Sequence, residues 1–121
     1  MTRLLPILLA ALALGLAACG SGEDEGDAPA SASACPDGAV VIAMRDIKFI
    51  PEDAEATVGD TVCWPNEEAI QHNAVAESGA DFRSELYGEG DTFTTELTEP
   101  GTVEYVCTVH PGMTGTIEVT P

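Results

Sequence analysis

The stretch that decides the fold runs GTVEYVCTVHPGMTGTIEVT, from Gly101 to Thr120. Apolar or sulfur-containing side chains recur at every second position in both of its halves. These positions are Val103, Tyr105, Cys107, Ile117 and Val119. Because successive side chains of a strand point to opposite faces, the stretch predicts two strands that share one buried face, with Cys107 turned inward.

Shorter runs upstream have the same extended character. They are rich in β-branched or alternating residues and end at Gly, Pro or Asp signals, at 40–44, 46–51, 56–58, 61–64 and 92–97. No segment keeps a helical period, and at most one helical turn is expected, at 84–87. The chain therefore predicts an all-β fold, a small sandwich or barrel of about seven to eight short strands.

Three potential metal ligands lie three residues apart in the loop between the two C-terminal strands, at Cys107, His110 and Met113. The chain has one further histidine, His72. Two imidazoles, a thiolate and a weak thioether are the ligands of a blue (type 1) copper site. The four residues together predict one bound copper ion.

Two other chemistries use some of the same residues. Zinc accepts cysteine and histidine, but its structural sites pair two cysteines or two histidines locally, and neither pattern occurs here. A nucleophilic pair of Cys107 and His110 would make the protein an enzyme. No third orienting residue or oxyanion donor is evident in the sequence, so copper is favoured and no enzymatic activity is expected.

Beyond this loop, the sequence resembles the cupredoxins, small blue copper proteins of the plastocyanin and amicyanin type. The resemblance extends from about Val40 to Val119. It rests on Phe49-x-Pro51, Val58-Gly59-Asp60-Thr61-Val62-x-Trp64-x-Asn66, His72-Asn73, Pro100-Gly101-Thr102 and Tyr105-x-Cys107-x-x-His110-Pro111-x-Met113. The two-residue gap between His110 and Met113 is similar to the short loop of amicyanin.

The resemblance implies a Greek-key β-sandwich with copper at one end. The implied ligands are His72, Cys107, His110 and Met113. Asn73 would tie the segment of His72 to the residue after Cys107, unless it is simply a turn asparagine. We expect electrons to enter through His110 and Pro111, inside an apolar rim of Gly112 and either Pro65 or Ile70.

Two cysteines depart from the cupredoxin pattern. Cys35 begins the folded part, and Cys63 occupies a strand position that is usually polar in the family. In an oxidising compartment the simplest expectation is a Cys35–Cys63 disulfide, with two independent thiols as the alternative.

The N-terminal residues predict export. Residues 1–18 contain one early arginine and an apolar run too short to span a bilayer, which is typical of a signal peptide. The run ends in Leu16-Ala17-Ala18-Cys19, which resembles the lipobox of bacterial lipoproteins, where the cysteine is lipidated. The alternative is an ordinary signal peptide with Cys19 as a bystander. The main prediction is thus a lipidated Cys19 that begins a flexible acidic linker at 19–34, followed by a copper-binding domain at 35–121.

The charge excludes nucleic acid as a partner. All 21 acidic residues follow Cys19, against three basic ones, so three minus 21 gives a net charge of −18 after signal removal. The acidic surface predicts either steering toward a positively charged redox partner or solubility in high salt.

These expectations describe a monomeric one-electron carrier, anchored by lipid to the outer face of a bacterial cell membrane or lying in the periplasm. Its partner would be a redox protein, such as a cytochrome or a membrane oxidase or reductase. Copper storage or delivery is the alternative, since the same ligands hold copper without electron transfer.

Overall fold

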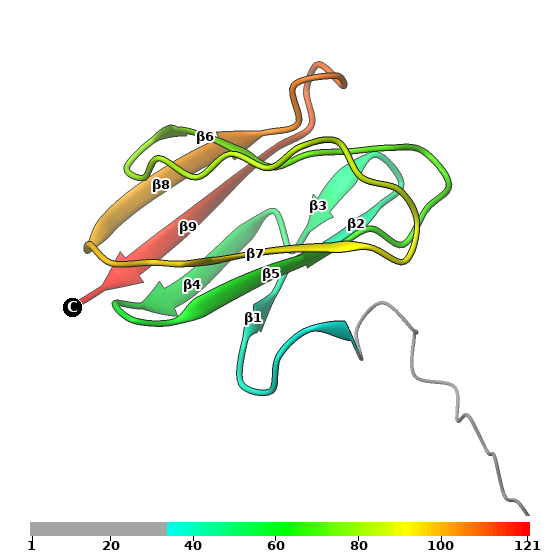
Figure 1. Ribbon diagram of the computed structural model, residues 1–121. Helices are drawn as coiled ribbons and strands as arrows, with labels where there is room; N and C mark the ends of the chain where they lie inside the picture. The colour runs from blue at the N-terminus through cyan, green and yellow to red at the C-terminus, as the bar shows by residue number, and fades with distance from the viewer. Residues whose placement is uncertain (1–33) are drawn as a thin grey trace, which may run out of the picture.

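The computed structural model describes residues 34–121; the predicted signal peptide, Cys19 and nearly all of the predicted linker lie outside the described residues. This part of the chain folds into strands joined by loops (Figure 1). The strands are β1 (Val40–Val41), β2 (Ala43–Arg45), β3 (Lys48–Ile50), β4 (Asp53–Thr57), β5 (Thr61–Pro65), β6 (Val75–Ser78), β7 (Thr92–Glu96), β8 (Gly101–Val106) and β9 (Thr114–Thr120). Within residues 34–121, no helix has the length and apolar character needed to cross a membrane.

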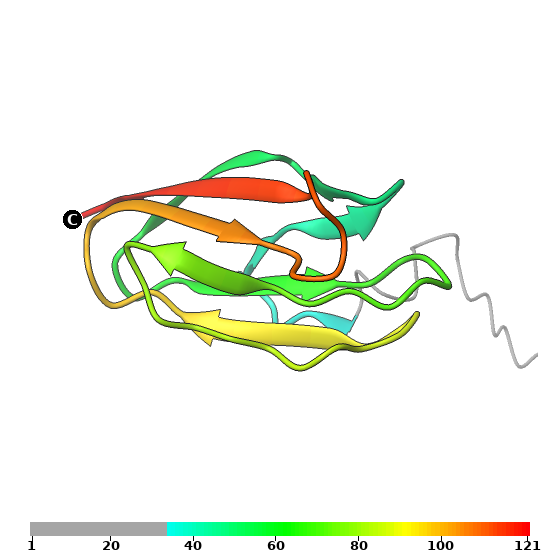
Figure 2. The same cartoon turned by 90° about the horizontal axis from the view of Figure 1, so that it is seen from above.

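The strands form two facing layers. One is a four-stranded sheet in the order β4-β9-β8-β6, seen across its face in Figure 2. The other is a three-stranded sheet in the order β1-β5-β7, with β5 in the middle. The short β2–β3 hairpin connects the two layers, because β2 contacts β5 of the smaller sheet and β3 contacts β9 of the larger one. The all-β sandwich is confirmed, with nine strands in the described residues because the first extended run divides into very short pieces.

The core lies between the layers and is rich in aromatic rings. Trp64 of β5 is fully buried, and its ring centroid lies 5.0 Å from Phe82, 5.6 Å from Phe93 and 5.5 Å from Tyr105. Phe49 packs edge-on against Tyr105 at 4.6 Å. The buried face of β8 and β9 is the one that the alternation predicts, since Val103, Tyr105, Ile117 and Val119 are all buried. Burial of such rings supplies the main driving force for closing the sandwich.

The β2–β3 hairpin turns on two residues, Asp46 and Ile47, between the paired Arg45 and Lys48. Both turn residues have left-handed backbone conformations, with φ of 55° and 54°. Two-residue hairpin turns of this kind favour Asn-Gly or Asp-Gly, because side chains with a Cβ are strained there. Sequence reasoning expected one or two strands over 40–51 and did not find this turn, since Ile47 carries no turn signal.

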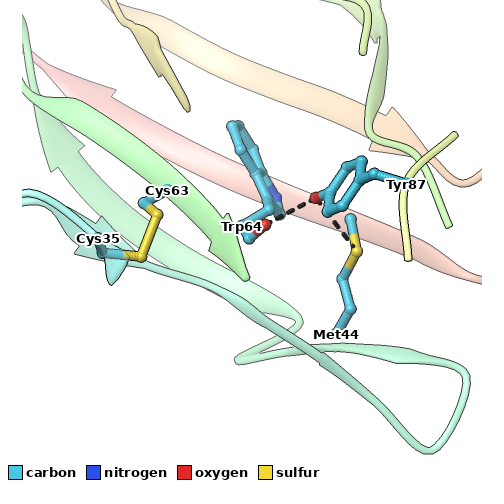
Figure 3. The surroundings of a disulfide bond; sticks show 5 residues. All are labelled: Cys35, Met44, Cys63, Trp64 and Tyr87. Carbon is cyan, nitrogen blue, oxygen red and sulfur yellow. Dashed lines mark hydrogen bonds between the residues drawn. A yellow bond between two sulfur atoms is a disulfide. The ribbon is translucent and has the colours of Figure 1, made fainter. Parts of the chain in front are cut away.

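The predicted disulfide is present and joins Cys35 to Cys63 in the middle of β5 (Figure 3). The residues that follow Cys35 return to the same strand, since Val40 and Val41 of β1 pair with Val62 and Cys63. Cys63 is fully buried, which explains how a non-polar residue is accommodated where the cupredoxin pattern expects a polar one.

The connection between β6 and β7 runs back along the segment that carries His72. The backbone of Phe82 accepts a hydrogen bond from Ala76, and Ser84 donates to Ala74. Residues 84–87 are therefore extended rather than helical, and the helical turn allowed by the sequence does not form. The segment acts as a partner strand for 72–76 and helps to fix the position of His72.

Candidate metal centre

His72 lies in the loop between β5 and β6 and is fully buried. Its backbone is paired with Tyr87, since His72 N donates to Tyr87 O at 3.2 Å and Tyr87 N donates to His72 O at 3.0 Å. Asn66 stabilises the same loop, because its side-chain nitrogen donates to the carbonyl oxygens of Ile70 and Tyr87. The imidazole is thus held on a backbone whose hydrogen bonds are satisfied from both sides.

Cys107, His110 and Met113 lie on the loop that follows β8, at the end of the sandwich opposite the C-terminus (Figure 1). Cys107 N donates to Met113 O at 2.9 Å, and Met113 N donates to His110 O at 3.0 Å. Gly112 turns the chain with φ of 88°, a conformation that favours glycine. The loop is therefore closed by its own backbone, and it starts and ends on strands that pair with each other.

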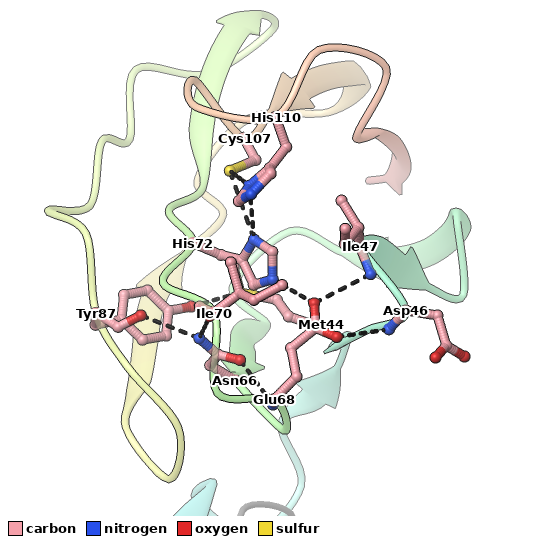
Figure 4. A network of polar contacts seen from close by, with 10 residues as sticks. All are labelled: Met44, Asp46, Ile47, Asn66, Glu68, Ile70, His72, Tyr87, Cys107 and His110. Carbon is pink, nitrogen blue, oxygen red and sulfur yellow. Dashed lines mark hydrogen bonds and ion pairs between the residues drawn. The ribbon is translucent and has the colours of Figure 1, made fainter.

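Three potential ligand atoms converge where this loop meets the His72 segment (Figure 4). His72 Nδ1 lies 3.1 Å from His110 Nδ1, and Cys107 Sγ lies 3.8 Å from His72 Nδ1 and 3.5 Å from His110 Nδ1. Donors bound to one tetrahedral metal ion at about 2.0 to 2.3 Å are separated from each other by about 3.3 to 3.6 Å. The three atoms are therefore spaced to share one ion.

Met113, the fourth predicted ligand, is buried, with 2% of its surface exposed, and is part of the core around the loop. Cys107 is almost equally buried, whereas His110 is half-buried and Pro111 and Gly112 are exposed. The set of a buried cysteine sulfur, two imidazoles and a nearby buried methionine fits copper, whose positive charge would balance a thiolate in this dry position.

Asn73 connects the two ligand-bearing segments. Its side-chain nitrogen donates to Thr108 Oγ1, and its oxygen accepts from Thr108 N, both at 2.8 Å. Thr108 is the residue after Cys107, the position that the resemblance implies for this contact. Both polar atoms of the amide are thus used, although Asn73 is only 5% exposed.

Glu68 also contacts the site, and sequence reasoning missed it. Its Oε1 lies 2.5 Å from His72 Nε2, the ring nitrogen that faces away from the other ligands (Figure 4). The same carboxylate accepts hydrogen bonds from the backbone amides of Asp46 and Ile47. Burial raises the pKa of Glu68, but the hydrogen bonds from His72, Ile47 and Asp46 outweigh it and hold this pKa below its ordinary value. The one sequence signal that could have identified Glu68 is its position four residues before the predicted ligand His72.

The surroundings of His110 carry exposed apolar side chains, but not all of those expected. Ile70 is 45% exposed and Val109 is 47% exposed, and Ile47 at the hairpin tip is 43% exposed. Pro65, the alternative to Ile70 for the rim, is fully buried inside β5. The prediction that Pro65 contributes to the rim is wrong, because its ring packs in the core.

Residues 36–120 match the sequence profile of a family described as copper binding proteins, plastocyanin/azurin family. The chain belongs to this family. Copper as the cofactor and the cupredoxin fold, both predicted from the sequence, are thereby confirmed, and the match covers nearly the whole of the described part of the chain.

Relatives within the family include both types of protein named by the resemblance. Amicyanin of Paracoccus denitrificans is 33% identical over 97 residues, which cover 77% of this chain and 74% of that protein. The major plastocyanin isoform of Arabidopsis thaliana is 31% identical over 87 residues, which cover 60% of this chain and 52% of that protein. The solved structure of an oxidized amicyanin mutant is similar with a TM-score of 0.67 at 33% identity, covering 74% of this chain and 89% of that one. These relatives agree with the prediction that the chain is not an enzyme.

Proposed function

We propose that this cupredoxin is a one-electron carrier whose copper ion is held by His72, Cys107, His110 and Met113. The observation that carries the proposal is the convergence of two imidazole nitrogens and a buried thiol sulfur within 3.1 to 3.8 Å of one another. Copper in such a ligand set cycles between Cu(I) and Cu(II) at a potential tuned by the protein.

The protein's part is to keep these donors in place while the charge of the site changes. His72 is fixed by Tyr87 and Glu68, and Cys107 is fixed by the strand pairing of β8 with β9 and by Asn73. Donors that are already ordered need little rearrangement when the electron arrives or leaves, which favours fast transfer.

An absorption spectrum of the oxidised, copper-loaded protein tests the assignment. We expect an intense visible band from charge transfer between the Cys107 thiolate and Cu(II), reversible on reduction, and its loss in Cys107→Ser. The matched control is Cys35→Ser with Cys63→Ser, which removes the other described cysteines and should leave the band in place. A protein that binds Cu(I) alone and stays colourless would indicate copper storage or delivery instead.

We propose further that electrons enter and leave through His110, beside the exposed Pro111. His110 is the half-buried imidazole of the site, whereas His72 is fully covered. Partners of redox carriers meet them through small, weak interfaces, and an apolar rim at this position suits brief contact.

Replacing Pro111 by glutamate should slow electron self-exchange between two copies of the protein. Two added carboxylates would then face each other at His110, the proposed port for electrons, and repel. The visible band should stay unchanged. Self-exchange is measured by line broadening in mixtures of reduced and oxidised protein. Thr98→Glu makes the same charge change between β7 and β8, at the other end of β8, and is the control; equal rates in both variants would contradict the port.

For the N-terminal residues we propose a signal peptide at 1–18, a lipidated Cys19 and a flexible linker at 19–34, which would hold the domain at 35–121 on the outer face of a membrane. The motif Leu16-Ala17-Ala18-Cys19 supports this assignment, and the extracytoplasmic setting agrees with the Cys35–Cys63 disulfide. Mass spectrometry of the mature N-terminus tests it. A diacylglyceryl group on Cys19 is expected, and an unmodified Cys19 in the membrane fraction would contradict it.

The acidic surface supports a positively charged redox protein as partner, with 21 acidic against four basic residues in the whole chain. Association rates measured with a cationic cytochrome should fall as salt is raised, since surface charges are screened over about 8 Å at physiological ionic strength. Rates that do not depend on salt would favour the acidic residues serving solubility alone.

A further inference from the structure

The carboxylate of Glu68 links two parts of the molecule that are far apart in the sequence. Its Oε1 accepts from His72 Nε2 and from Ile47 N at 3.0 Å, and its Oε2 accepts from Asp46 N at 2.9 Å. The side chain is 19% exposed, so most of it is withdrawn from water. One carboxylate therefore holds a proposed copper ligand and both residues of the β2–β3 turn.

The contact with His72 determines which ring nitrogen can bind a metal. An ionised carboxylate only accepts hydrogen bonds, so Nε2 of His72 must carry the proton in this contact. In the neutral ring the lone pair is then on Nδ1, the atom that faces Cys107 and His110. Glu68 thus fixes both the orientation and the tautomer that metal binding needs.

The contact with the turn stabilises a strained conformation. Asp46 and Ile47 are both left-handed, and neither is a glycine. Non-glycine residues persist in such conformations only where surrounding contacts hold them. The amides of these two residues face outward from a two-residue hairpin, and here both are bound by Glu68.

We propose that Glu68 is a positioning residue that couples the tip of the β2–β3 hairpin to the copper ligand His72. This inference rests on the proposed copper site. With copper held at Nδ1, the His72 ring would be restrained, and through it Glu68 and the amides of Asp46 and Ile47. By linkage the coupling is reciprocal, so a change at the exposed tip also changes copper binding. A partner that contacts Ile47 would act on the copper through this carboxylate.

Glu68→Gln is the informative variant because it keeps size and shape. A single amide oxygen can still accept from His72 and Ile47, but the amide nitrogen would face the N–H of Asp46, donor against donor. Glu67→Gln is the matched control. It removes the same charge at the neighbouring position, from a carboxylate that pairs with Arg45 at 3.0 Å.

The first measurement is Cu(I) affinity by competition with a chromogenic chelator. Loss of a residue that orients a metal-bound histidine typically lowers affinity about 10- to 100-fold, and we expect a loss of this size for Glu68→Gln. Glu67→Gln should remain close to the wild type. Equal affinities of the two variants would overturn the inference, because the effect would then be one of net charge.

The second measurement is amide hydrogen exchange at Asp46 and Ile47, by NMR of the copper-free and the diamagnetic Cu(I)-loaded protein. In the wild type, loading should slow exchange at both amides, and in Glu68→Gln this slowing should be lost at Asp46. Unchanged exchange on loading of the wild type would refute the coupling.

If the wild type shows no blue band, the proposed function fails on its own. Comparison of the copper-free wild type with copper-free Glu68→Gln still tests the contact to the turn, where faster exchange at Asp46 in the variant is expected and equal exchange would refute it.

Discussion

Asn73 holds the two ligand-bearing segments of the copper site at a fixed separation, through two hydrogen bonds to Thr108. The amide is nearly buried, so both bonds are shielded on its side from water. A hydrogen-bonding group that loses its partner in such a position lowers stability. Asn73 is therefore important to the site although it is not itself a proposed metal ligand.

Asn73→Ala should lower the free energy of unfolding by about 1 to 3 kcal/mol, because Thr108 N loses its acceptor. Thr108→Ser is the matched control. It keeps both the hydroxyl acceptor and the backbone amide, so both bonds to Asn73 remain and its cost should be less than about 1 kcal/mol. Urea titration of the two variants makes the comparison, and an equal loss in both would show that the two bonds contribute nothing.

Ile47 has a left-handed backbone conformation that is unfavourable for a β-branched residue. A left-handed conformation costs a residue with a Cβ roughly 1 to 2 kcal/mol, whereas glycine adopts it freely. Ile47→Gly should raise the free energy of unfolding by about 0.5 to 1 kcal/mol, after the greater flexibility of unfolded glycine is subtracted.

Val58→Gly provides the comparison for Ile47→Gly, since Val58 is also β-branched and is 37% exposed. Its backbone is not left-handed, so glycine should destabilise there. Thermal unfolding of both variants decides the matter: if Ile47→Gly is as destabilising as Val58→Gly, the turn is not strained.

At the scale of elements, the pairing of β8 with β9 positions the copper loop. Tyr105 of β8 lies opposite Gly115 of β9, and its ring covers the glycine. A Cβ placed at Gly115 would lie 2.4 Å from the ring and hydroxyl of Tyr105. The absence of a side chain at Gly115 is thus what leaves room for the Tyr105 ring, two residues before Cys107.

Gly115→Ala should destabilise the protein by about 1 to 3 kcal/mol, the usual cost of an added methyl group in a packed core. Gly88→Ala is the control, because a Cβ there would meet nothing within 4 Å. Chemical denaturation should separate the two variants clearly. A Gly115→Ala protein as stable as Gly88→Ala would mean that the Tyr105 ring moves aside without cost.

Elements with local signals could be predicted from the sequence. The faces of β8 and β9 follow from alternation, and the loop ligands follow from their spacing around Cys107. The β2–β3 turn could not be predicted, because Ile47 has no turn preference and Glu68, distant in the sequence, binds the amides of both turn residues. Residues 84–87 are extended because they pair with the His72 segment, a contact with no signature in their local sequence. Pro65 was one of two candidates, with Ile70, for the apolar rim around His110, and the sequence could not show that β5 buries it.

At the scale of the whole molecule, the Cys35–Cys63 disulfide fixes the start of the domain to the middle strand of the smaller sheet. The two cysteines are 28 residues apart, and the loop they close includes the β2–β3 hairpin and β4. Closing a loop of this length stabilises a protein by about 3 to 4 kcal/mol in the chain-entropy model. Such a contribution is large for a small domain.

Removing the disulfide with Cys35→Ala and Cys63→Ala together should lower the free energy of unfolding by about 3 to 4 kcal/mol. The visible copper band should persist, since Cys107 is free of the disulfide. Guanidinium titration of the copper-loaded protein, followed through that band, measures both properties. An unchanged unfolding midpoint would contradict the stabilising role, and a lost band would show that the disulfide also shapes the copper site.

The same disulfide has a mechanical consequence if Cys19 carries the lipid anchor proposed above. Strand β1 has only two residues, and its pairing with β5 alone would be peeled away easily by tension on the chain before it. Because a covalent bond joins Cys35 directly to the centre of β5, tension is delivered to a strand that neighbours hold on both sides. Under the proposed lipid anchor, we therefore expect a pull on the chain before Cys35 to be borne by β5 and not to reach the loops at the other end of the sandwich.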